Sequence, residues 1–127
     1  MNPVELKYAK EHEWVRVEGD VAVIGISEFA QDQLGEVVFV DMPSEGDTVT
    51  AGETFGEIES VKSVSELYSP LTGEIVAVND SLSDVPETVN SDPYGDGWMI
   101  KVEIADPSEL DDLMSAEEYE AFVAETA

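Results

Sequence analysis

Residues 56–75 read GEIESVKSVSELYSPLTGEI and place Lys62 between two strand-like runs. The pattern predicts a β-hairpin with this lysine at its tip. Val61 and Val64 flank it, where polar residues are usual in a turn. The chain has four lysines against 30 acidic residues, so a lysine kept at a hairpin tip indicates a role: an exposed amine on a rigid turn suits enzymatic modification. The alternative is a turn lysine without a function.

Two similar segments, 46–60 and 69–82, flank the hairpin. Each carries a threonine and a Gly-Glu pair that lead into an apolar strand, as if the halves were related by a pseudo-twofold axis through the tip. Self-similarity over so few residues has little weight by itself. We expect about residues 46–80 to form the hairpin core of the fold.

Local signals before this core predict a second hairpin, a helix and a strand. Residues 13–17 and 21–26 alternate as strands around a turn that contains Gly19. Ser27 is placed to cap a short helix that ends before Gly35. The following stretch, EVVFVDMP, predicts a buried strand stopped by its proline.

After the core, residues 79–97 are rich in Asp, Ser, Gly and Pro and predict a long ordered loop. The run WMIKVEI alternates as a strand, and a short helix is expected after Pro107. Ser115 and Glu118 form a capping box that opens a terminal helix. Its apolar stripe consists of Tyr119, Phe122 and Val123. The fold class is therefore mostly β, with peripheral short helices and a C-terminal helical segment over about residues 107–125.

The length of 127 residues predicts one domain, 1–127, and a hydrophobic content of 43% argues against a disordered acidic chain. No apolar run approaches the roughly 20 residues that a bilayer requires, so no membrane association is expected. The N-terminal stretch has no apolar block behind its charges, so no secretory signal is expected. Cysteine is absent, which excludes disulfides and thiolate chemistry.

A net charge of −25 argues against nucleic acid as a partner. Residues 106–125 hold eight acids and no base. This imbalance favours adaptation to a very salty cytoplasm, because salt screens repulsion between neighbouring carboxylates. The alternative is an ordinary acidic carrier protein.

Two other features suggest chemistry at first sight. Asp92, Asp96, Gly97 and Glu103 fall at calcium-loop spacing, but Tyr94 occupies a ligand position and a strand follows where a helix is needed. His12, the single histidine, lies between two glutamates without a second convergent group, and we interpret it as a surface residue at a strand start. No nucleophile, phosphate or dinucleotide motif is present. The residues alone therefore predict neither a metal site nor an active site.

The hairpin stretch resembles the lipoyl-lysine hairpin of the glycine cleavage system H protein family. The similarity extends over nearly the whole chain: LKYAKEHEWV, IGISEFAQDQLGEVVFVDMP, ESVKS, PETVNSDPYGDGWMIKV and LMSAEEYEAF all match. The lipoyl domains of 2-oxo-acid dehydrogenases typically carry Asp-Lys-Ala and biotin carriers Met-Lys-Met, and neither has these flanking segments. In this resemblance, Lys62 is the residue whose amine forms an amide with lipoic acid.

The resemblance implies a barrel-sandwich hybrid fold and a carrier rather than an enzyme. The lipoyl arm of such a protein receives an aminomethyl group from glycine decarboxylase, a pyridoxal-phosphate enzyme. It delivers the group to the aminomethyltransferase, and dihydrolipoyl dehydrogenase reoxidises the arm. A lipoate-attaching enzyme is the fourth implied partner, and the implied location is the cytoplasm, here of a halophilic prokaryote.

The resemblance also implies a cleft that shelters the loaded arm. Glu13 matches a carboxylate of the family, Ile26 and Ser27 match part of the cleft wall, and Glu66 lies where the family often has an acid. Gln33 departs from the pattern, because many relatives have histidine there. Two alternatives stay open: a lipoyl carrier of another system or a lipoate-relay protein, and a binding module that is never modified.

Overall fold

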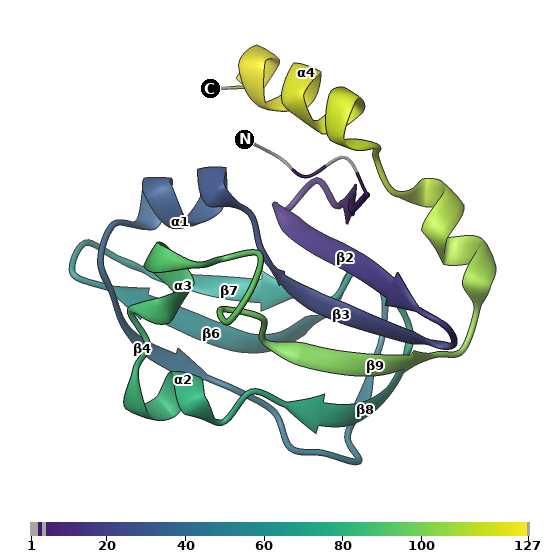
Figure 1. The fold of residues 1–127 in the computed structure, drawn as a ribbon, viewed down its shortest axis with the longest axis horizontal. Coiled ribbons are helices and arrows are strands. Elements are labelled where there is room, and N and C mark those ends of the chain that lie inside the picture. Colours follow the sequence, from purple (N-terminus) through teal and green to yellow (C-terminus); the bar gives the residue numbers. More distant parts are fainter. Residues whose placement is uncertain (1–2, 4, 127) are drawn as a thin grey trace.

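The computed structural model describes residues 3 and 5–126, which form two β-sheets with helices around them (Figure 1). In chain order the elements are β1 (Lys7–Tyr8), β2 (Glu13–Glu18), β3 (Val21–Ile26), α1 (Glu28–Leu34), β4 (Val37–Asp41), β5 (Thr48–Val49), β6 (Thr54–Ser60), β7 (Val64–Tyr68), β8 (Gly73–Val78), α2 (Ser81–Asp84), α3 (Thr88–Ser91), β9 (Ile100–Ile104), the 3-10 helix η1 (Pro107–Asp112) and α4 (Ala116–Thr126).

One sheet has six strands in the order β1-β2-β3-β9-β8-β5, and the other has three in the order β4-β6-β7. Every pairing is antiparallel. The predicted similar halves, β5–β6 and β7–β8, each give one strand to each sheet, with β6 paired to β7 and β5 to β8. The predicted mostly β class is confirmed, and the strands form two separate sheets rather than one closed barrel.

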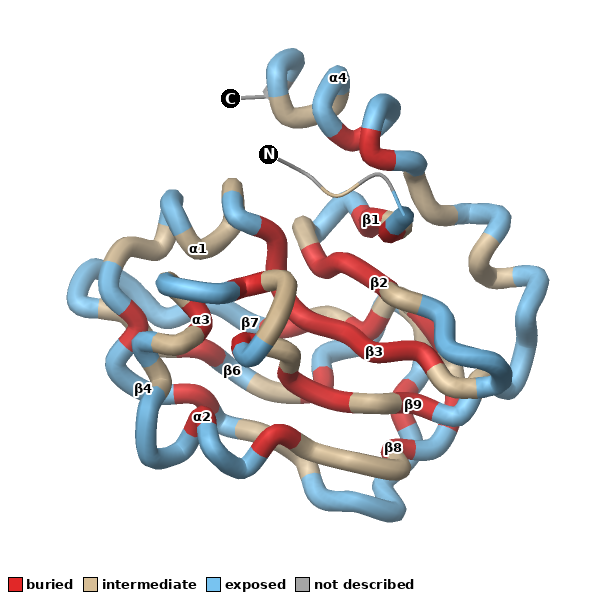
Figure 2. The backbone as a smooth tube through the Cα atoms, in the orientation of Figure 1, coloured by how far each residue is buried: buried red, intermediate tan, exposed pale blue. Residues whose placement is uncertain are grey.

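The main core consists of inward-facing side chains of the strands together with Leu82 of α2 and Val89 of α3, and its residues are among the buried segments drawn in red in Figure 2. Burial of these apolar side chains supplies most of the free energy that holds the sheets together. Its fully buried members include Ile24, Ile58, Leu67, Leu71, Ile75, Leu82, Val89 and Ile100.

A second cluster joins the C-terminal helix to the first strands. Tyr8 and Tyr119 stack with ring centroids 4.7 Å apart and planes 8° apart, and both side chains are fully buried. Tyr8 also forms an isolated β-bridge with Met114. Phe122 and Val123 pack against the same cluster, so the predicted apolar stripe of the terminal helix is confirmed. The capping box is confirmed too, because Ser115 and Glu118 exchange side chain–backbone hydrogen bonds.

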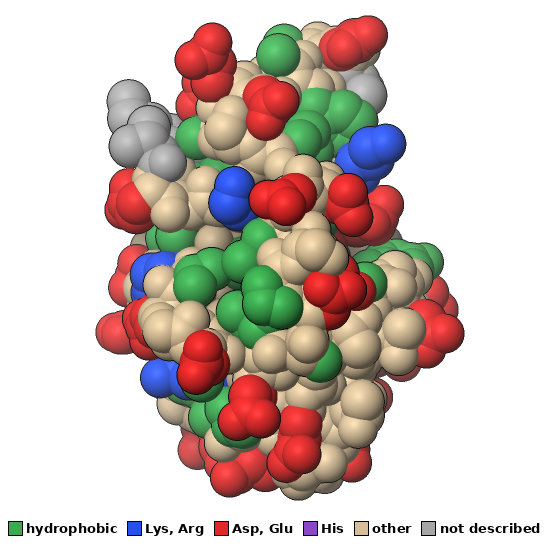
Figure 3. All heavy atoms as spheres, turned by 90° about the vertical axis from the view of Figure 1, so that its right-hand side faces the viewer, with side chains coloured by type: hydrophobic (Ala, Val, Ile, Leu, Met, Phe, Trp, Pro, Cys, Tyr) green, Lys and Arg blue, Asp and Glu red, His purple; other side chains and the backbone are tan. Residues whose placement is uncertain are grey.

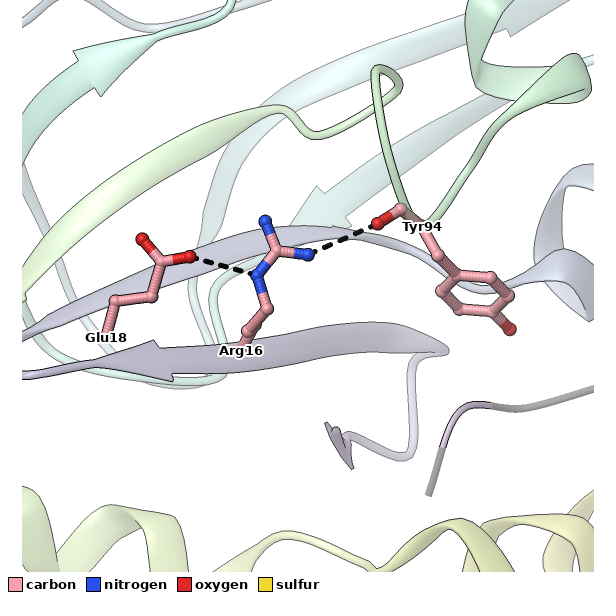
Figure 4. Close-up of polar contacts among 3 residues, drawn as sticks. All are labelled: Arg16, Glu18 and Tyr94. Atoms are coloured by element: carbon pink, nitrogen blue, oxygen red, sulfur yellow. Dashed lines mark hydrogen bonds and ion pairs between the residues drawn. The ribbon is translucent and has the colours of Figure 1, made fainter. Parts of the chain in front are cut away.

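Trp14 fixes β2 against both its neighbour strand and the loop before β9. Its ring covers Gly25, where an added Cβ would lie 2.7 Å from the indole. The indole N–H donates to the Pro93 carbonyl oxygen at 2.9 Å. Arg16, one of the few cations, lies over the Trp14 ring. It also donates to the Tyr94 carbonyl oxygen and pairs with Glu18 (Figure 4).

Two predictions of local structure are wrong. The stretch 36–43 contains an edge strand, β4, instead of a buried one: Val38 and Phe39 are 46% and 49% exposed. A bulge after Val37 turns these side chains outward, and β4 has a partner on one side only. The stretch 79–97 is also not all loop, because it contains the helical turns α2 and α3.

Acidic side chains dominate the face shown in Figure 3, where they surround a small apolar patch, and only a few basic groups accompany them. Among the described residues, no helix is long and apolar enough to cross a membrane.

Candidate functional site

The turn that carries Lys62 is closed by hydrogen bonds of its own. Ser60 N–H donates to the Ser63 carbonyl oxygen at 2.8 Å, and Ser60 Oγ accepts from the backbone N–H groups of Lys62 and Ser63 at 3.2 and 3.1 Å. Lys62 is exposed, and Val61 and Val64 beside it are 65% and 58% exposed. The hairpin tip therefore presents a primary amine and two apolar side chains on a rigid turn.

The same tip is tied to the end of α1. Val61 N–H donates to the Glu36 carbonyl oxygen at 3.0 Å. Gly35, the C-cap of α1, has a φ of 82°, and a Cβ placed on it would lie 2.8 Å from Lys62 Cε. The aliphatic stem of Lys62 thus lies against Gly35, a residue whose backbone conformation favours glycine.

A cleft of about 340 Å³ opens beside the hairpin, between α1, β7 and the start of β2. Its lining is apolar along one part and polar along another, and Ser63 and Val64 bring its edge to within one residue of Lys62. The lining consists of Glu11, His12, Glu13, Ile26, Phe29, Ala30, Gln33, Leu34, Ile58, Ser63, Val64, Ser65, Glu66 and Leu67.

The structure brings together three of the predicted cleft residues, Glu13, Ile26 and Glu66, and Gln33 lines the same cleft. Ser27 does not line it. Its buried hydroxyl instead accepts from Ala30 N–H as the N-cap of α1, so Ser27 supports a wall of the cleft from behind.

Glu13 is the most unusual polar group of the cleft. Its side chain is 2% exposed, and Oε2 accepts from Tyr68 N–H at 3.3 Å. Oε1 is the single buried side-chain oxygen without a partner within the described residues. Burial raises the pKa of Glu13 to about 8, opposed by the Tyr68 hydrogen bond and reinforced by the charge of Glu11. A buried carboxyl with a vacant oxygen is a ready acceptor for a cationic or hydrogen-donating group.

Glu66 occupies the cleft mouth on β7. It is exposed and accepts a hydrogen bond from Tyr68 O–H at 3.0 Å. This bond raises the pKa of Tyr68, since the phenol loses its favourable partner when it ionises. The backbone N–H of the same tyrosine donates to Glu13 of β2. Tyr68 therefore contacts two carboxyl groups of one cleft, the buried Glu13 and the exposed Glu66.

His12 is a cleft residue whose position the sequence did not indicate. It is half-buried in the cleft wall rather than on the surface, with Nδ1 2.7 Å from the Tyr119 hydroxyl and its ring against Phe29. Its φ of 76° is the only positive value for a non-glycine residue in the described part of the chain. The sequence around it, Glu-His-Glu, carries no signal for either property.

No calcium site forms where the spacing suggested one. The Asp92 carboxylate accepts from Asp96 N–H at 2.9 Å and lies within contact distance of Gly95, so it organises its own turn. Within residues 3 and 5–126, no group of three or more His, Cys, Asp or Glu side chains is arranged to hold a metal ion.

The comparisons with known proteins agree with this geometry. The family model of the glycine cleavage H-protein matches residues 6–126. A glycine cleavage system H protein from Bacteroides thetaiotaomicron is 57% identical over 121 residues, which cover 95% of this chain and 96% of that protein. The crystal structure of a glycine cleavage system H protein from Mycobacterium marinum superposes with a TM-score of 0.90 at 39% identity and covers 97% of this chain and 99% of that one. The chain belongs to the glycine cleavage H-protein family.

Proposed function

We propose that this chain is the lipoyl-bearing shuttle of a glycine cleavage system, with Lys62 as the attachment residue. The observation that carries the proposal is the position of this amine: it stands on a closed turn next to a cleft that contains a buried, half-partnered carboxyl group. Family membership supports the same assignment.

The residues present fit a lipoyl group. Lys62 offers an exposed amine for an amide bond, and the attaching enzyme has access to it because the turn projects from the sheets. Ile26, Phe29 and Leu34 provide apolar surface for an aliphatic arm. When bound, the lipoyl group supplies the dithiolane chemistry that lets a carrier take up and release an aminomethyl group.

Glu13 and Glu66 divide the recognition of a cationic cargo between them. Glu66 at the mouth keeps a solvated negative charge, which attracts an ammonium group without a large desolvation cost. Glu13 at depth has one oxygen free to accept an ammonium N–H, and that contact is stronger where water is excluded. Ser27 contributes indirectly by fixing the start of α1.

The chain acts in this proposal as one carrier domain, and the chemistry belongs to its partners. Glycine decarboxylase loads the aminomethyl group, the aminomethyltransferase removes it, and dihydrolipoyl dehydrogenase restores the oxidised arm. We place the carrier in the cytoplasm of a halophilic cell, because the sequence contains 30 acidic residues and only 5 lysines and arginines. High salt would screen the repulsion among them.

Glycine–carbon dioxide exchange tests the proposal. Purified decarboxylase is assayed with the lipoylated and the unlipoylated chain, and intact mass establishes the state of each sample. We expect exchange with the lipoylated form alone. Equal exchange with the unlipoylated form would refute the assignment, and a chain that remains unmodified in its own cells would favour the unmodified binding module instead.

A further inference from the structure

The C-terminal helix reaches the cleft through one hydroxyl group. Tyr119 on α4 is fully buried, and its oxygen lies 2.7 Å from His12 Nδ1 and 2.7 Å from Ser27 Oγ. His12 lines the cleft and directly precedes Glu13, whereas Ser27 caps the helix that forms the opposite wall. One side chain from the far end of the sequence therefore connects both segments that carry the site.

One arrangement of the hydrogen atoms gives every polar group of this network a partner. Ser27 Oγ already accepts from Ala30 N–H, and its own hydrogen, fully buried, needs an acceptor. The Tyr119 oxygen is the acceptor within reach. The Tyr119 hydrogen is then directed to His12 Nδ1, which must accept, so the imidazole is neutral with its hydrogen on Nε2.

The backbone at His12 requires such support. Its φ of 76° lies in a region that residues with a Cβ rarely adopt unless their surroundings impose it. His12 N–H donates to the Ala9 carbonyl oxygen at 3.0 Å, and Ser27 N–H donates to the His12 carbonyl oxygen at 2.9 Å. With the side chain held by Tyr119 as well, the direction in which Glu13 leaves this turn is fixed.

The charge of His12 matters for cargo binding. A cationic imidazole in the wall of the cleft would repel an incoming ammonium group. Burial lowers the pKa of His12 and the charge of Glu11 opposes the shift, so the net effect favours the neutral ring. A hydrogen bond donated to Nδ1 favours the same neutral state. The titratable groups around it are Glu11 and Glu13 on its own segment, Tyr119 on α4 and Glu66 across the cleft, while α1 presents the uncharged Phe29.

We propose that Tyr119 is a positioning residue for cargo binding: its hydroxyl holds His12 as a neutral acceptor, fixes the turn that aims Glu13 into the cleft, and leaves that carboxyl group available to the cargo. This inference rests on the proposed function for the identity of the cargo. Its structural part, the state of the His12 ring, does not depend on that function.

The first test observes the ring in the full-length protein. His12 is the only histidine, so the ¹⁵N and ¹³C signals of its ring are identified without further assignment. We expect a neutral ring with the hydrogen on Nε2 in the wild type. In Tyr119→Phe, the pKa of His12 should rise by about one pH unit, the equivalent of one lost hydrogen bond to the neutral ring.

Tyr8→Phe is the matched control. Tyr8 stacks on Tyr119 in the same cluster and loses a comparable hydrogen bond, 2.7 Å to the Pro3 carbonyl oxygen, but that bond does not involve His12. The control should leave the His12 titration unchanged. A wild-type ring with its hydrogen on Nδ1, an unchanged titration in Tyr119→Phe, or an equal shift in both variants would each overturn the inference.

The second test follows the loss of the aminomethyl group from the loaded carrier to water between pH 6 and 8. Tyr119→Phe should lose it faster than the wild type as pH falls from 8 to 6, by up to about tenfold, because its histidine takes up a proton at higher pH than the wild-type histidine does. Adding His12→Asn, which tolerates positive φ and cannot become cationic, should remove this pH dependence. An acceleration that is equal at every pH would overturn the inference in favour of general loosening. A chain that is never lipoylated or loaded would instead refute the proposed function, and the ring measurement would still decide the state of His12.

Discussion

Lys62 and Glu13 illustrate two ways in which single residues prepare a carrier. Lys62 is exposed on a turn that its neighbouring serines close, so its amine is available before any partner arrives. Glu13 is buried and has an oxygen without a partner, which is unfavourable in the empty protein and favourable once a cation enters. The two residues belong to different strands, and the cleft between α1 and β7 connects them.

Lys62→Arg is expected to abolish lipoyl attachment and to leave the fold intact. Arginine keeps the charge and a long stem, but its guanidinium cannot be acylated as a lysine amine can. Intact mass after incubation with a lipoate ligase measures the effect. Lys101→Arg is the control, because an arginine there can still stack on Trp98 as the lysine does. Lipoate on the Lys62 variant would contradict the assignment.

Glu13→Gln is expected to make the empty protein more stable than the wild type, by a difference that grows as pH rises. The pKa of Glu13 is raised from 4.5 to about 8 in the folded state, so the folded chain holds a proton that the unfolded chain releases. Stability is therefore lost as pH increases from about 4.5 to 8, and glutamine avoids this loss while it still accepts from Tyr68 N–H.

The variant should unfold at higher denaturant concentration than wild type at pH 8, by the equivalent of roughly 1–4 kcal/mol, and the difference should shrink toward pH 5. The same variant should retain its cargo less well, since an amide holds an ammonium group less tightly than a carboxylate does. A stability difference that does not change with pH would contradict the ionisation assigned to Glu13.

Among the elements, β2 and β3 depend on the fit of one ring over one glycine. Gly25→Ala would place a Cβ 2.7 Å from the Trp14 indole and is expected to destabilise the protein by about 1–3 kcal/mol, measured as a lower melting temperature. Combining it with Trp14→Phe, a smaller ring, should cost less than the sum of the two single changes. If the two losses of stability simply add in the double variant, the two side chains do not interact.

Elements fixed by neighbours in sequence were predictable. Ser27 caps α1, and Ser115 and Glu118 form the capping box of α4, because these contacts join residues three positions apart. The outward turn of Val38 and Phe39 was not predictable, since it depends on a bulge and on the edge position of β4.

Within the site, the position of Lys62 at a hairpin tip was predictable from the sequence pattern, and its proposed attachment role came from the family resemblance. The role of His12 was not predictable, because its partner Tyr119 lies 107 positions away in the sequence. The unpaired oxygen of Glu13 could not be predicted from the sequence either. Whether a buried oxygen finds a hydrogen-bond partner depends on how β7 and α1 pack around it.

For the whole molecule, the dominant property is a net charge of −25 on 127 residues. Carboxylates concentrated in η1 and α4 repel one another in dilute buffer, where the screening length exceeds their spacing. We expect the melting temperature to rise between dilute buffer and about 1 M potassium chloride, by roughly 5 °C for each kcal/mol gained. An unchanged melting temperature would contradict halophilic adaptation and leave the carrier assignment as it stands.

The pairing of Tyr8 with Met114 and Tyr119 sets an order of events during protein synthesis. The ribosome releases the hairpin with Lys62 well before α4, so a nascent chain can form its attachment site while Tyr8 and His12 still lack their partners. The hydrogen bond between Tyr119 and the cleft residue His12 forms only when α4 emerges and packs against β1. Under the proposed function, a chain truncated before α4 would therefore still accept lipoate but would lose the group carried on the arm to water faster than the full-length chain does.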